Sequence, residues 1–402
     1  MRQIPRKEYL DWLIRWKEKQ IIKVVSGVRR CGKSTMFEIF RNYLLEQGVS
    51  NDQLITINFE DIEFEALTDY RFLYSYIKER LIPDKMNYIF LDEIQHVDQF
   101  EKVVDSLFIK ENADVYITGS NAYFMSSELA TLLTGRYVEL KMLPLSFKEY
   151  YQACEEQTDS KAAVFNRYRA LGSFPYIIKF KLNHQETREY LQDIYHSILF
   201  KDVVGRQKIT DINSLENVTR FLMHNIGNKV SVSKIANTLK SQNKGVDPKT
   251  VDKYIRGLTE SLLLYEARRY NIKGKQFLST QPKYYAVDCG LRNMLVKGKD
   301  SDAGHILENI VYLELLRRGH EVYVGAVEET EVDFITQKDG KIEYYQVSLT
   351  TLDENTLKRE LAPFKNIHDH YPKYLLTLDD LFDTANYEGI IKMNVLDWLL
   401  EN

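Results

Sequence analysis

The stretch VVSGVRRCGKSTMF, residues 24–37, limits the fold of this chain more than any other part of its sequence. It joins a short apolar run to a segment with helical spacing, and it matches the pattern G-x(4)-G-K-[ST] from Gly27 to Ser34. Two glycines let the backbone of such a loop wrap an oxyanion with its amide groups turned inward. The pattern therefore predicts a phosphate-binding loop between a buried strand and the positive end of a helix.

The side chains of this loop predict Mg²⁺-ATP as the ligand. Lys33 supplies a positive charge to the β and γ phosphates, and Ser34 offers its hydroxyl group to Mg²⁺. We expect Arg29 and Arg30 to flank the nucleotide or support the loop, and Cys31 to point away from the phosphates. The residues expected around the nucleotide are Gly27, Arg29, Arg30, Cys31, Gly32, Lys33, Ser34 and Thr35.

A second half of the site is expected at the end of the strand NYIFLDE, residues 87–93. Asp92 would hold Mg²⁺ through its water shell, and Glu93 would orient and polarise the attacking water. A second carboxylate is needed for hydrolysis but not for binding alone. The alternative is that this acidic pair only caps the helix that opens at Ile94.

Two further positions are candidates for contact with the γ-phosphate. The strand ending in YITGSNA carries Thr118, Ser120 and Asn121, which are placed to act as a sensor, although Ser120 or Asn121 would equally serve as helix caps. Arg136 stands just before another strand, where an arginine can act in trans on the nucleotide of a second copy. The alternative is an exposed arginine without a special role.

The first 150 residues alternate apolar strands with amphipathic helices. The strands are expected at 21–27, 54–60, 87–93 and 114–120, with helices between them at 34–47 and 97–110. Nearly continuous hydrophobicity is typical of strands buried on both faces of a parallel sheet. The order predicts an α/β fold in which helices cover both faces of a parallel sheet.

The remainder of the chain is predicted to form three further parts. Residues 151–225 are a helical segment, and residues 226–290 read as a winged helix-turn-helix: a helix capped by Ser231 or Ser233, a turn, a second helix from Asp247 to Ser261, and the basic hairpin NIKGK. Residues 291–402 return to an α/β pattern, with one long helix followed by three strands.

The charge distribution suggests an anion-facing module. The formal net charge is -4, but residues 229–283 hold twelve Lys or Arg against four Asp or Glu, a local balance of +8 that leaves -12 elsewhere. A basic winged helix of this kind suits the phosphates of DNA, with its second helix in a major groove. Winged helices also serve as protein–protein modules, and that alternative stays open.

The C-terminal part has the order of a restriction-endonuclease-like fold. A helix carries Glu308, the next strand but one carries Asp333, and a further strand carries Gln346 in a [DEQ]-x-K position. In such nucleases these groups gather a metal ion and the lysine stabilises developing charge. Ser348 stands here in place of that lysine, so we expect no cleavage of DNA. The alternative is an ordinary α/β domain.

Composition excludes several other classes of protein. No apolar run reaches the roughly 18 residues of a membrane span, and the charged, aromatic-rich first twenty residues are not a secretory signal. The three cysteines, Cys31, Cys154 and Cys289, are too few and too far apart for a disulfide framework or a zinc site. We therefore expect a cytoplasmic protein without membrane association.

The sequence also resembles a known family. The stretches VVSGVRRCGKSTMF, YIFLDEIQHV, YITGSNAYFMSSELATLLTGRYVELKMLPLSFKEYY and GSFPYIIK are similar to prokaryotic AAA-type ATPases of the archaeal-ATPase-like group, in which an AAA_14 domain precedes a DUF4143 region. This resemblance covers nearly the whole chain and implies an ATPase with Gly32, Lys33, Ser34, Asp92 and Glu93 as its Walker residues.

Three functions are consistent with these patterns. The first is an ATPase whose nucleotide state moves or gates the winged helix and the C-terminal part. The second is a DNA-binding regulator switched by ATP, and the third and least favoured is an ATPase-linked nuclease. Arg136 acting in trans would require a homo-oligomer, but the sequence does not distinguish a ring, a dimer and a monomer.

Overall fold

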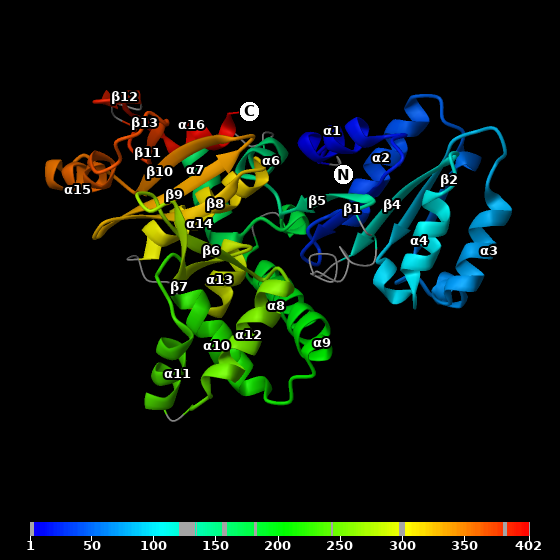
Figure 1. Ribbon diagram of the computed structural model, residues 1–402, viewed down its shortest axis with the longest axis horizontal. Coiled ribbons are helices and arrows are strands. Elements are labelled where there is room, and N and C mark those ends of the chain that lie inside the picture. The colour runs from blue at the N-terminus through cyan, green and yellow to red at the C-terminus, as the bar shows by residue number, and fades with distance from the viewer. Residues whose placement is uncertain are drawn as a thin grey trace. The chain divides into compact units, whose positions relative to one another are not determined.

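The computed structural model describes residues 4–119, 133, 135–154, 159–180, 183–242, 244–296, 302–380 and 384–401 (Figure 1). The chain divides into two compact units. The first comprises Met1–Leu143 with Glu260–Leu262, and the second comprises Pro144–Thr259 with Leu263–Asn402.

The first unit is built on a five-stranded sheet in the order β2-β3-β4-β1-β5. Its strands are β1 (Ile22–Gly27), β2 (Leu54–Asn58), β3 (Asn87–Asp92), β4 (Ala113–Gly119) and β5 (Tyr137–Met142). All neighbouring strands run parallel. β1 and β3 are buried along their whole length, as their unbroken apolar character predicts. The predicted parallel sheet is confirmed.

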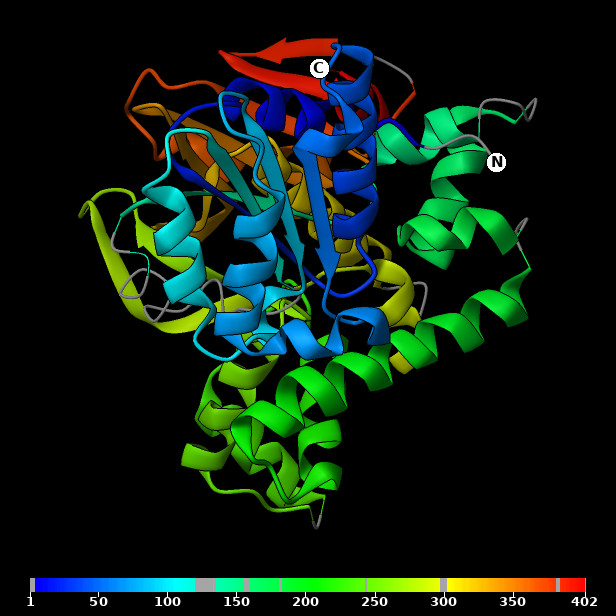
Figure 2. The same ribbon diagram turned by 90° about the vertical axis from the view of Figure 1, so that its right-hand side faces the viewer.

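Helices cover both faces of this sheet (Figures 1 and 2). On one face, Phe40 of a helix packs against Phe90 and Tyr116 of the central strands, with ring centroids 6.1 and 5.2 Å away. On the other face, Leu73 and Val103 of two further helices join strand residues in one apolar core. The helices are α1 (Lys7–Trp16), α2 (Lys33–Glu46), α3 (Tyr70–Arg80) and α4 (Phe100–Phe108), with short turns η1 (Asn51–Gln53), η2 (Ile62–Thr68) and η3 (Ile94–His96).

The strand order places the candidate residues at one edge of the sheet. β4 lies between β1 and β3, so the carboxyl ends of these three strands are neighbours. The loop from Gly27 follows β1, Asp92 ends β3, and Thr118 lies near the end of β4. Open parallel sheets bind ligands outside the carboxyl ends of their strands, so this edge is the expected position of a site.

The second unit begins with helices, as the sequence predicts for residues 151–225. A seven-residue π-helical stretch, η5 (Ile198–Val204), joins α8 to α9 without a break in the helix. Phe147 packs edge-on against Phe165 and Tyr168 of the same unit. The N-terminal stretch of the first unit therefore ends at Leu143. The helices are α6 (Phe147–Ala153), α7 (Lys161–Leu171), η4 (Pro175–Phe180), α8 (His184–Ser197), η5 (Ile198–Val204), α9 (Gly205–Gln207) and α10 (Ile212–His224).

Two helices and a hairpin follow in the order expected of a winged helix-turn-helix. They are α11 (Val232–Ser241), α12 (Pro248–Glu260), β6 (Leu264–Asn271) and β7 (Gln276–Ala286). Ser231, not Ser233, caps the first helix by accepting a hydrogen bond from the Lys234 amide at 3.1 Å. The Asp247 carboxylate accepts hydrogen bonds from two amides at the start of the second.

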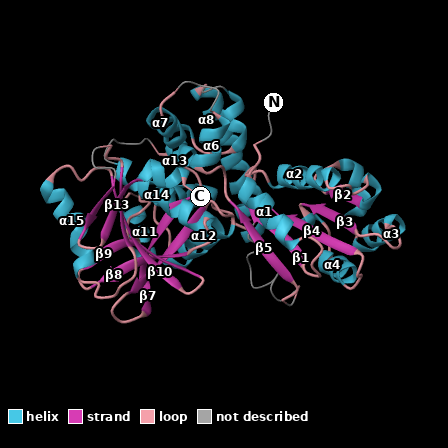
Figure 3. Cartoon of the chain, turned by 90° about the horizontal axis from the view of Figure 1, so that it is seen from above, coloured by secondary structure: helices cyan, strands magenta, loops and turns pink. Residues whose placement is uncertain are grey.

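An eight-stranded mixed sheet, in the order β12-β13-β11-β10-β9-β8-β6-β7, forms the rest of this unit (Figure 3). Its other strands are β8 (Glu321–Val327), β9 (Thr330–Lys338), β10 (Lys341–Ser348), β11 (Lys373–Thr377), β12 (Thr384–Tyr387) and β13 (Ile390–Asn394). The helices that accompany it are α13 (Cys289–Leu295), α14 (Ala303–Arg317), α15 (Glu354–Lys365) and α16 (Val395–Leu400).

The hairpin assigned to the wing is part of this sheet. β6 pairs with β8 in parallel, and the rings of Tyr270 and Phe277 contact Tyr323 of β8 at 6.3 and 5.1 Å between centroids. The boundary expected at residue 290 therefore separates strands of a single sheet. The division into four parts remains a prediction from sequence. The structure shows two compact units.

Two expectations from composition can be compared with the structure. All three cysteines are buried and none forms a disulfide. Within the described ranges, every helix is too short or too polar to cross a lipid bilayer.

Candidate nucleotide-binding site

The loop after β1 has the backbone geometry that its glycines predict. Gly32 takes φ 106° and ψ 22° at the position directly before α2, and Arg30 takes φ 65°. Gly27 is required for a different reason: a Cβ atom there would lie 2.5 Å from the Met142 carbonyl oxygen and 2.8 Å from the Cys31 sulfur. Left-handed residues within a short loop turn successive amides to one side, which is the arrangement that binds anions.

Lys33 connects the loop to the acidic end of β3. Its ammonium group is buried, donates to the Gly27 carbonyl at 3.1 Å, and lies 3.5 Å from Glu93 Oε1. The sequence predicts that Lys33 contacts the β and γ phosphates and that Glu93 orients the attacking water, and the structure places these two side chains beside each other.

Asp92 lies between two hydroxyl groups. Thr118 donates a hydrogen bond to Asp92 Oδ1, and the Ser34 hydroxyl is also a hydrogen-bond partner of this carboxyl group. Burial raises the pKa of Asp92 above its ordinary value, while the two hydroxyl groups act in the opposite direction. Ser34 itself is exposed. A buried carboxylate next to an exposed hydroxyl is a donor set of the hard oxygen type that Mg²⁺ takes.

Glu93 adopts a left-handed backbone conformation, with φ 55° and ψ 47°. Its amide donates to Thr118 Oγ1 at 2.9 Å, and the Gln95 side-chain amide donates to Glu93 Oε2 at 2.5 Å. The Glu93 side chain makes no capping hydrogen bond to the turn that follows, so the capping alternative is not what the structure shows. Thr118 therefore supports both acidic residues from the neighbouring strand.

The other loop residues lie around this centre. Arg29 pairs with Glu60 at 3.1 Å, and Arg30 and Thr35 are exposed. Cys31 is fully buried beneath the loop, and burial raises the pKa of its thiol. That its side chain points away from a bound phosphate stays a prediction.

Arg136 is placed on the surface of the first unit. Its guanidinium group pairs with Asp105 of α4 at 3.2 Å and lies over the Phe108 ring, and the side chain is 45% exposed. The Arg136 carbonyl oxygen accepts a hydrogen bond from the Ile22 amide at 2.9 Å, so Arg136 lies at the start of β1, whereas the loop follows the end of this strand. Of the three sensor candidates, Thr118 is described above, and Ser120 and Asn121 lie outside the described residues.

Sequence reasoning missed two residues of this site. Arg6 donates to the carbonyls of Cys31 and Leu143, both at 2.8 Å, and so ties the loop to the segment after β5. Gln95 holds the Glu93 carboxylate. Neither residue belongs to a spaced pattern: Arg6 is one of several charges near the start of the chain, and Gln95 is an ordinary polar residue after a strand.

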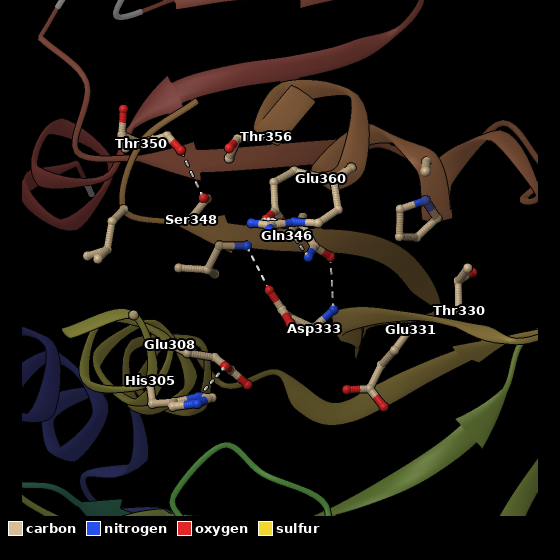
Figure 4. Close-up of a pocket in the computed structure, with 16 residues that line it drawn as sticks. His305, Glu308, Thr330, Glu331, Asp333, Gln346, Ser348, Thr350, Thr356 and Glu360 are labelled. Atoms are coloured by element: carbon tan, nitrogen blue, oxygen red, sulfur yellow. Dashed lines mark hydrogen bonds and ion pairs between the residues drawn. The ribbon is translucent and has the colours of Figure 1, made fainter. Parts of the chain in front are cut away.

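A second group of predicted residues meets in the other unit. Glu308 of α14, Asp333 of β9 and Gln346 of β10 line a cavity of about 770 Å³ (Figure 4). The cavity is also lined by Ser348, which donates to the Thr350 carbonyl at 3.1 Å. The structure therefore brings together the residues of the nuclease-like pattern, including the serine that replaces its lysine.

Lys283 of β7 is the residue that the sequence analysis misplaced in this region. It was counted with the basic surface, but it is 4% exposed and lies 2.9 Å from Glu308 and 2.8 Å from Glu331. Burial opposes its charge, yet Glu308, Asp333 and Glu331 together raise the pKa of Lys283 above its ordinary value. A charged residue inside the aromatic run KYYAV was the available signal for a buried ion pair.

The pKa values of two acidic neighbours of Lys283 are shifted in opposite directions. Burial disfavours the charge of Glu308, but Lys283, His305 and Tyr285 lower the pKa of this carboxyl group to about 2. Burial and the charge of Glu308 raise the pKa of Asp333 well above its ordinary value. The ion pair between Lys283 and Glu308 is therefore the charged centre of this cluster at neutral pH.

Comparisons with known proteins agree with part of the expected family. A model of the AAA_14 family (AAA domain) matches residues 19–151, and a domain of unknown function, DUF8612, matches residues 163–302. The AAA_14 assignment is confirmed. The second region carries the DUF8612 label instead of the DUF4143 label that the resemblance suggested, so that label is corrected.

Two curated relatives align with nearly the whole chain. An uncharacterised protein of Haemophilus influenzae is 39% identical over 401 residues, 99% of each chain. An uncharacterised protein of Methanocaldococcus jannaschii is 31% identical over 396 residues, covering 94% of this chain and 85% of its own. Among solved structures, a Walker-type ATPase of Pyrococcus abyssi aligns with 72% of this chain and 95% of its own, at 15% identity and a TM-score of 0.49.

Proposed function

Because the chain belongs to the family that includes the Haemophilus influenzae and Methanocaldococcus jannaschii proteins, and its N-terminal part is an AAA domain, we propose that it binds Mg²⁺-ATP and hydrolyses ATP. The loop from Gly27 to Thr35 would hold the phosphates through its backbone amides, with the start of α2 adding its positive dipole end. The adenine and ribose would lie beside Arg29 and Arg30.

Each polar group at the edge of the sheet has a distinct role in this proposal. Lys33 neutralises charge on the β and γ phosphates, Ser34 and Asp92 are the residues that would hold Mg²⁺, and Glu93 accepts a proton from the attacking water. The bound Mg²⁺ would supply positive charge to the phosphate oxygens. The Thr118 hydroxyl group donates to the Asp92 carboxylate and accepts a hydrogen bond from the Glu93 backbone amide, so it positions the first side chain and the backbone of the second.

One observation carries the proposal: the start of α2, which follows β1, and the end of β3 meet although β4 separates the two strands. Ser34 there contacts Asp92, and Lys33 contacts Glu93. A phosphate loop that served only as a structural turn would need no acid pair at this place. The contact between Ser34 and Asp92 is the relation that a shared metal ligand set requires.

The experiment is a comparison of ATP binding and turnover in three variants. Lys33→Ala is expected to abolish both, because the phosphate charge loses its partner. Glu93→Gln is expected to keep ATP binding while lowering turnover about 100-fold or more, since only the proton acceptor is lost. Glu101→Gln on α4 makes the same chemical change away from the loop and should match the wild type. Turnover by Glu93→Gln at the wild-type rate would show that Glu93 is not the base.

We further propose that Arg136 acts on the nucleotide of a second copy of the chain. In its ion pair Arg136 is exposed and Asp105 is partly exposed. Such surface pairs contribute only about 0–1 kcal/mol, so the guanidinium group can exchange partners at little cost. Turnover per chain should then rise with protein concentration in the wild type and stay low in Arg136→Ala. Concentration-independent turnover with full activity of Arg136→Ala would rule out this role.

A second candidate function is ATP-switched binding of DNA by α11, α12 and the hairpin. The observation that favours it is a stripe on α12: Lys249, Lys253 and Arg256 are exposed at helical spacing, while Val251 and Leu258 are buried on the opposite side. The hairpin adds exposed Lys273 and Lys275. Twelve basic residues were counted in this segment, but Lys283 is buried and does not contribute to this surface.

Anisotropy of labelled duplex DNA tests this candidate at increasing salt. Lys253→Glu should weaken binding and reduce the steepness of the salt dependence, because each lost phosphate contact removes about 0.9 from the slope of log affinity against log salt. Lys85→Glu, an exposed lysine of the first unit, is the matched control for net charge. If the wild type does not bind duplex DNA at low salt, or if both variants weaken binding equally, α12 is not a DNA-reading helix.

A further inference from the structure

The cavity of the second unit contains the groups that a metal-dependent nuclease would need. Figure 4 shows Glu308 on α14, Asp333 on β9 and Gln346 on β10 around one space. A divalent cation in such a site is held by oxygen atoms of ionised carboxylates and of amide carbonyls. Whether the residues fit a metal therefore depends on which of their oxygen atoms are available.

Each of these three residues already makes hydrogen bonds within the chain. Glu308 Oε1 accepts hydrogen bonds from Tyr285 at 2.6 Å and from Lys283 at 2.9 Å. Asp333 Oδ2 accepts from the Val347 amide at 2.9 Å. Gln346 turns its carbonyl oxygen to the Asp333 amide at 3.2 Å and its NH₂ group to Glu360 at 2.8 Å. The motif residues thus hydrogen-bond to the protein in place of a metal.

The second carboxylate oxygen of Glu308 also has a partner within the chain. Glu308 Oε2 lies 3.6 Å from His305 Nδ1. Among the residues that the structure describes, no group of three His, Cys, Asp or Glu side chains has an arrangement suited to a metal ion. The residues present do not fit a divalent cation.

Lys283 occupies the centre of the acidic cluster. Its ammonium group lies 2.9 Å from Glu308, 2.8 Å from Glu331 and 3.8 Å from Asp333. A divalent cation would have to share these carboxylates with an ammonium group that repels it. Lys229 adds a second ammonium group 3.1 Å from Glu331, so two positive charges already face the three acids.

A lysine near these acids has another interpretation, namely that it replaces the lysine missing at Ser348. A lysine that stabilises charge on a bound phosphate must reach the space where the phosphate lies. Lys283 is buried and is not one of the residues that line the cavity. Its position matches that of a bound cation and not that of a group acting on a substrate.

We propose that Lys283 is a built-in cation that takes the place of a divalent metal ion between Glu308, Glu331 and Asp333. The C-terminal part then has the framework of a metal-dependent nuclease fold but a site that is satisfied without metal. This inference is independent of the proposed ATP hydrolysis, because the residues that carry it belong to the other unit.

Mn²⁺ binding without nucleotide, followed by electron paramagnetic resonance, tests the proposal. The wild type is expected to lack a Mn²⁺ site that depends on Asp333. Lys283→Met should gain one such site, with affinity at least tenfold above that of the wild type, and Lys283→Met/Asp333→Asn should lose it again. Lys229→Met removes the exposed lysine of the same cluster and should gain no site, because Lys283 remains. Lys283→Arg keeps the charge and should also gain none.

Thermal unfolding with and without Mn²⁺ shows whether each variant is folded and gives a second measure of Mn²⁺ binding. Mn²⁺ should raise the melting temperature of Lys283→Met and leave that of the wild type unchanged. Lys283→Gln, which still donates a hydrogen bond to Glu308, serves as the second variant if the methionine form is unstable. A Mn²⁺ site in the wild type that Asp333→Asn removes would overturn the proposal. The proposal would also be overturned if neither Lys283→Met nor Lys283→Gln gained a Mn²⁺ site.

Discussion

At the scale of single residues, glycine positions decide whether the phosphate loop can form. Gly27 is needed because the last residue of β5 lies directly beside it, with the Met142 carbonyl oxygen 2.5 Å from where a Cβ atom would be. Gly48, in contrast, has a positive φ of 88° and open space around it. The two positions separate the effect of close contact from the effect of backbone strain.

We therefore expect Gly27→Ala to be the more costly of the two substitutions. Overpacking against a backbone carbonyl costs about 1–3 kcal/mol, in addition to the roughly 1 kcal/mol that a left-handed backbone costs any side chain. Urea unfolding should show a larger loss of unfolding free energy for Gly27→Ala than for Gly48→Ala, and only Gly27→Ala should lose binding of a fluorescent ATP analogue. Equal losses would mean that the loop relaxes around the added methyl group.

Single residues also explain why sequence reasoning found the Walker residues but missed two of the residues that support them. Lys33, Ser34 and Asp92 belong to patterns of fixed spacing after a strand, and such patterns have a chemical reason that can be recognised without coordinates. Gln95 and Arg6 act through hydrogen bonds to single groups of the site, and nothing in the spacing of polar residues distinguishes them from surface residues.

At the scale of elements, buried ion pairs join strands that are distant in sequence. The Asp379 carboxylate, after β11, accepts hydrogen bonds from the Thr351 amide at 2.9 Å and from Lys392 of β13 at 2.8 Å. Although burial opposes its charge, hydrogen bonds from Lys392, Thr350 and Thr351 lower the pKa of Asp379 to about 2. This residue links the ends of three neighbouring strands.

The lowered pKa determines the pH range of this link. Because the native state holds Asp379 ionised more readily than the unfolded chain, its stabilisation is present above the ordinary value of 3.8 and is lost as the pH falls toward 2. Asp379→Asn should cost about 3 kcal/mol at pH 7, and the difference from the wild type should shrink below pH 4. Asp380→Asn, an exposed neighbour, is the control in urea unfolding. A difference independent of pH would mean that packing, not charge, is responsible.

Elements also show where tertiary pairing changed the interpretation of the sequence. The helices and the hairpin of residues 226–290 occur where their periodicity and turn residues predict them. Their assignment to a separate module overlooked the partner of β6, because strand pairing depends on residues 264–271 meeting residues 321–327 across the chain. No local pattern records that contact.

At the scale of the whole molecule, each compact unit has an apolar core of its own. The three tryptophans report on them separately, since Trp12 and Trp16 belong to α1 and Trp398 to α16. ATP at 100 times its dissociation constant adds about 2.7 kcal/mol to the unfolding free energy of the folded unit that binds it. Nucleotide should therefore stabilise the unit that contains the loop.

This prediction is measured by tryptophan fluorescence during urea unfolding. In Trp398→Phe, where the signal comes from the first unit, Mg²⁺-ATP should move the midpoint to higher urea. In Trp12→Phe/Trp16→Phe, where Trp398 reports on the second unit, the midpoint should stay in place. Adding Lys33→Ala should remove the shift from the first form. A common shift in both forms would show that the two units unfold together.

The sequence by itself determined the phosphate loop, the acidic strand end and the alternation of strands and helices, because each depends on residues close together in the chain. The order of the strands, the place of the hairpin at the edge of the C-terminal sheet and the burial of Lys283 among Glu308, Glu331 and Asp333 were decided only by the tertiary structure. Those features arise when segments far apart in sequence pack against each other. Burial then changes a lysine that composition counts as a surface charge into the centre of an internal ion pair.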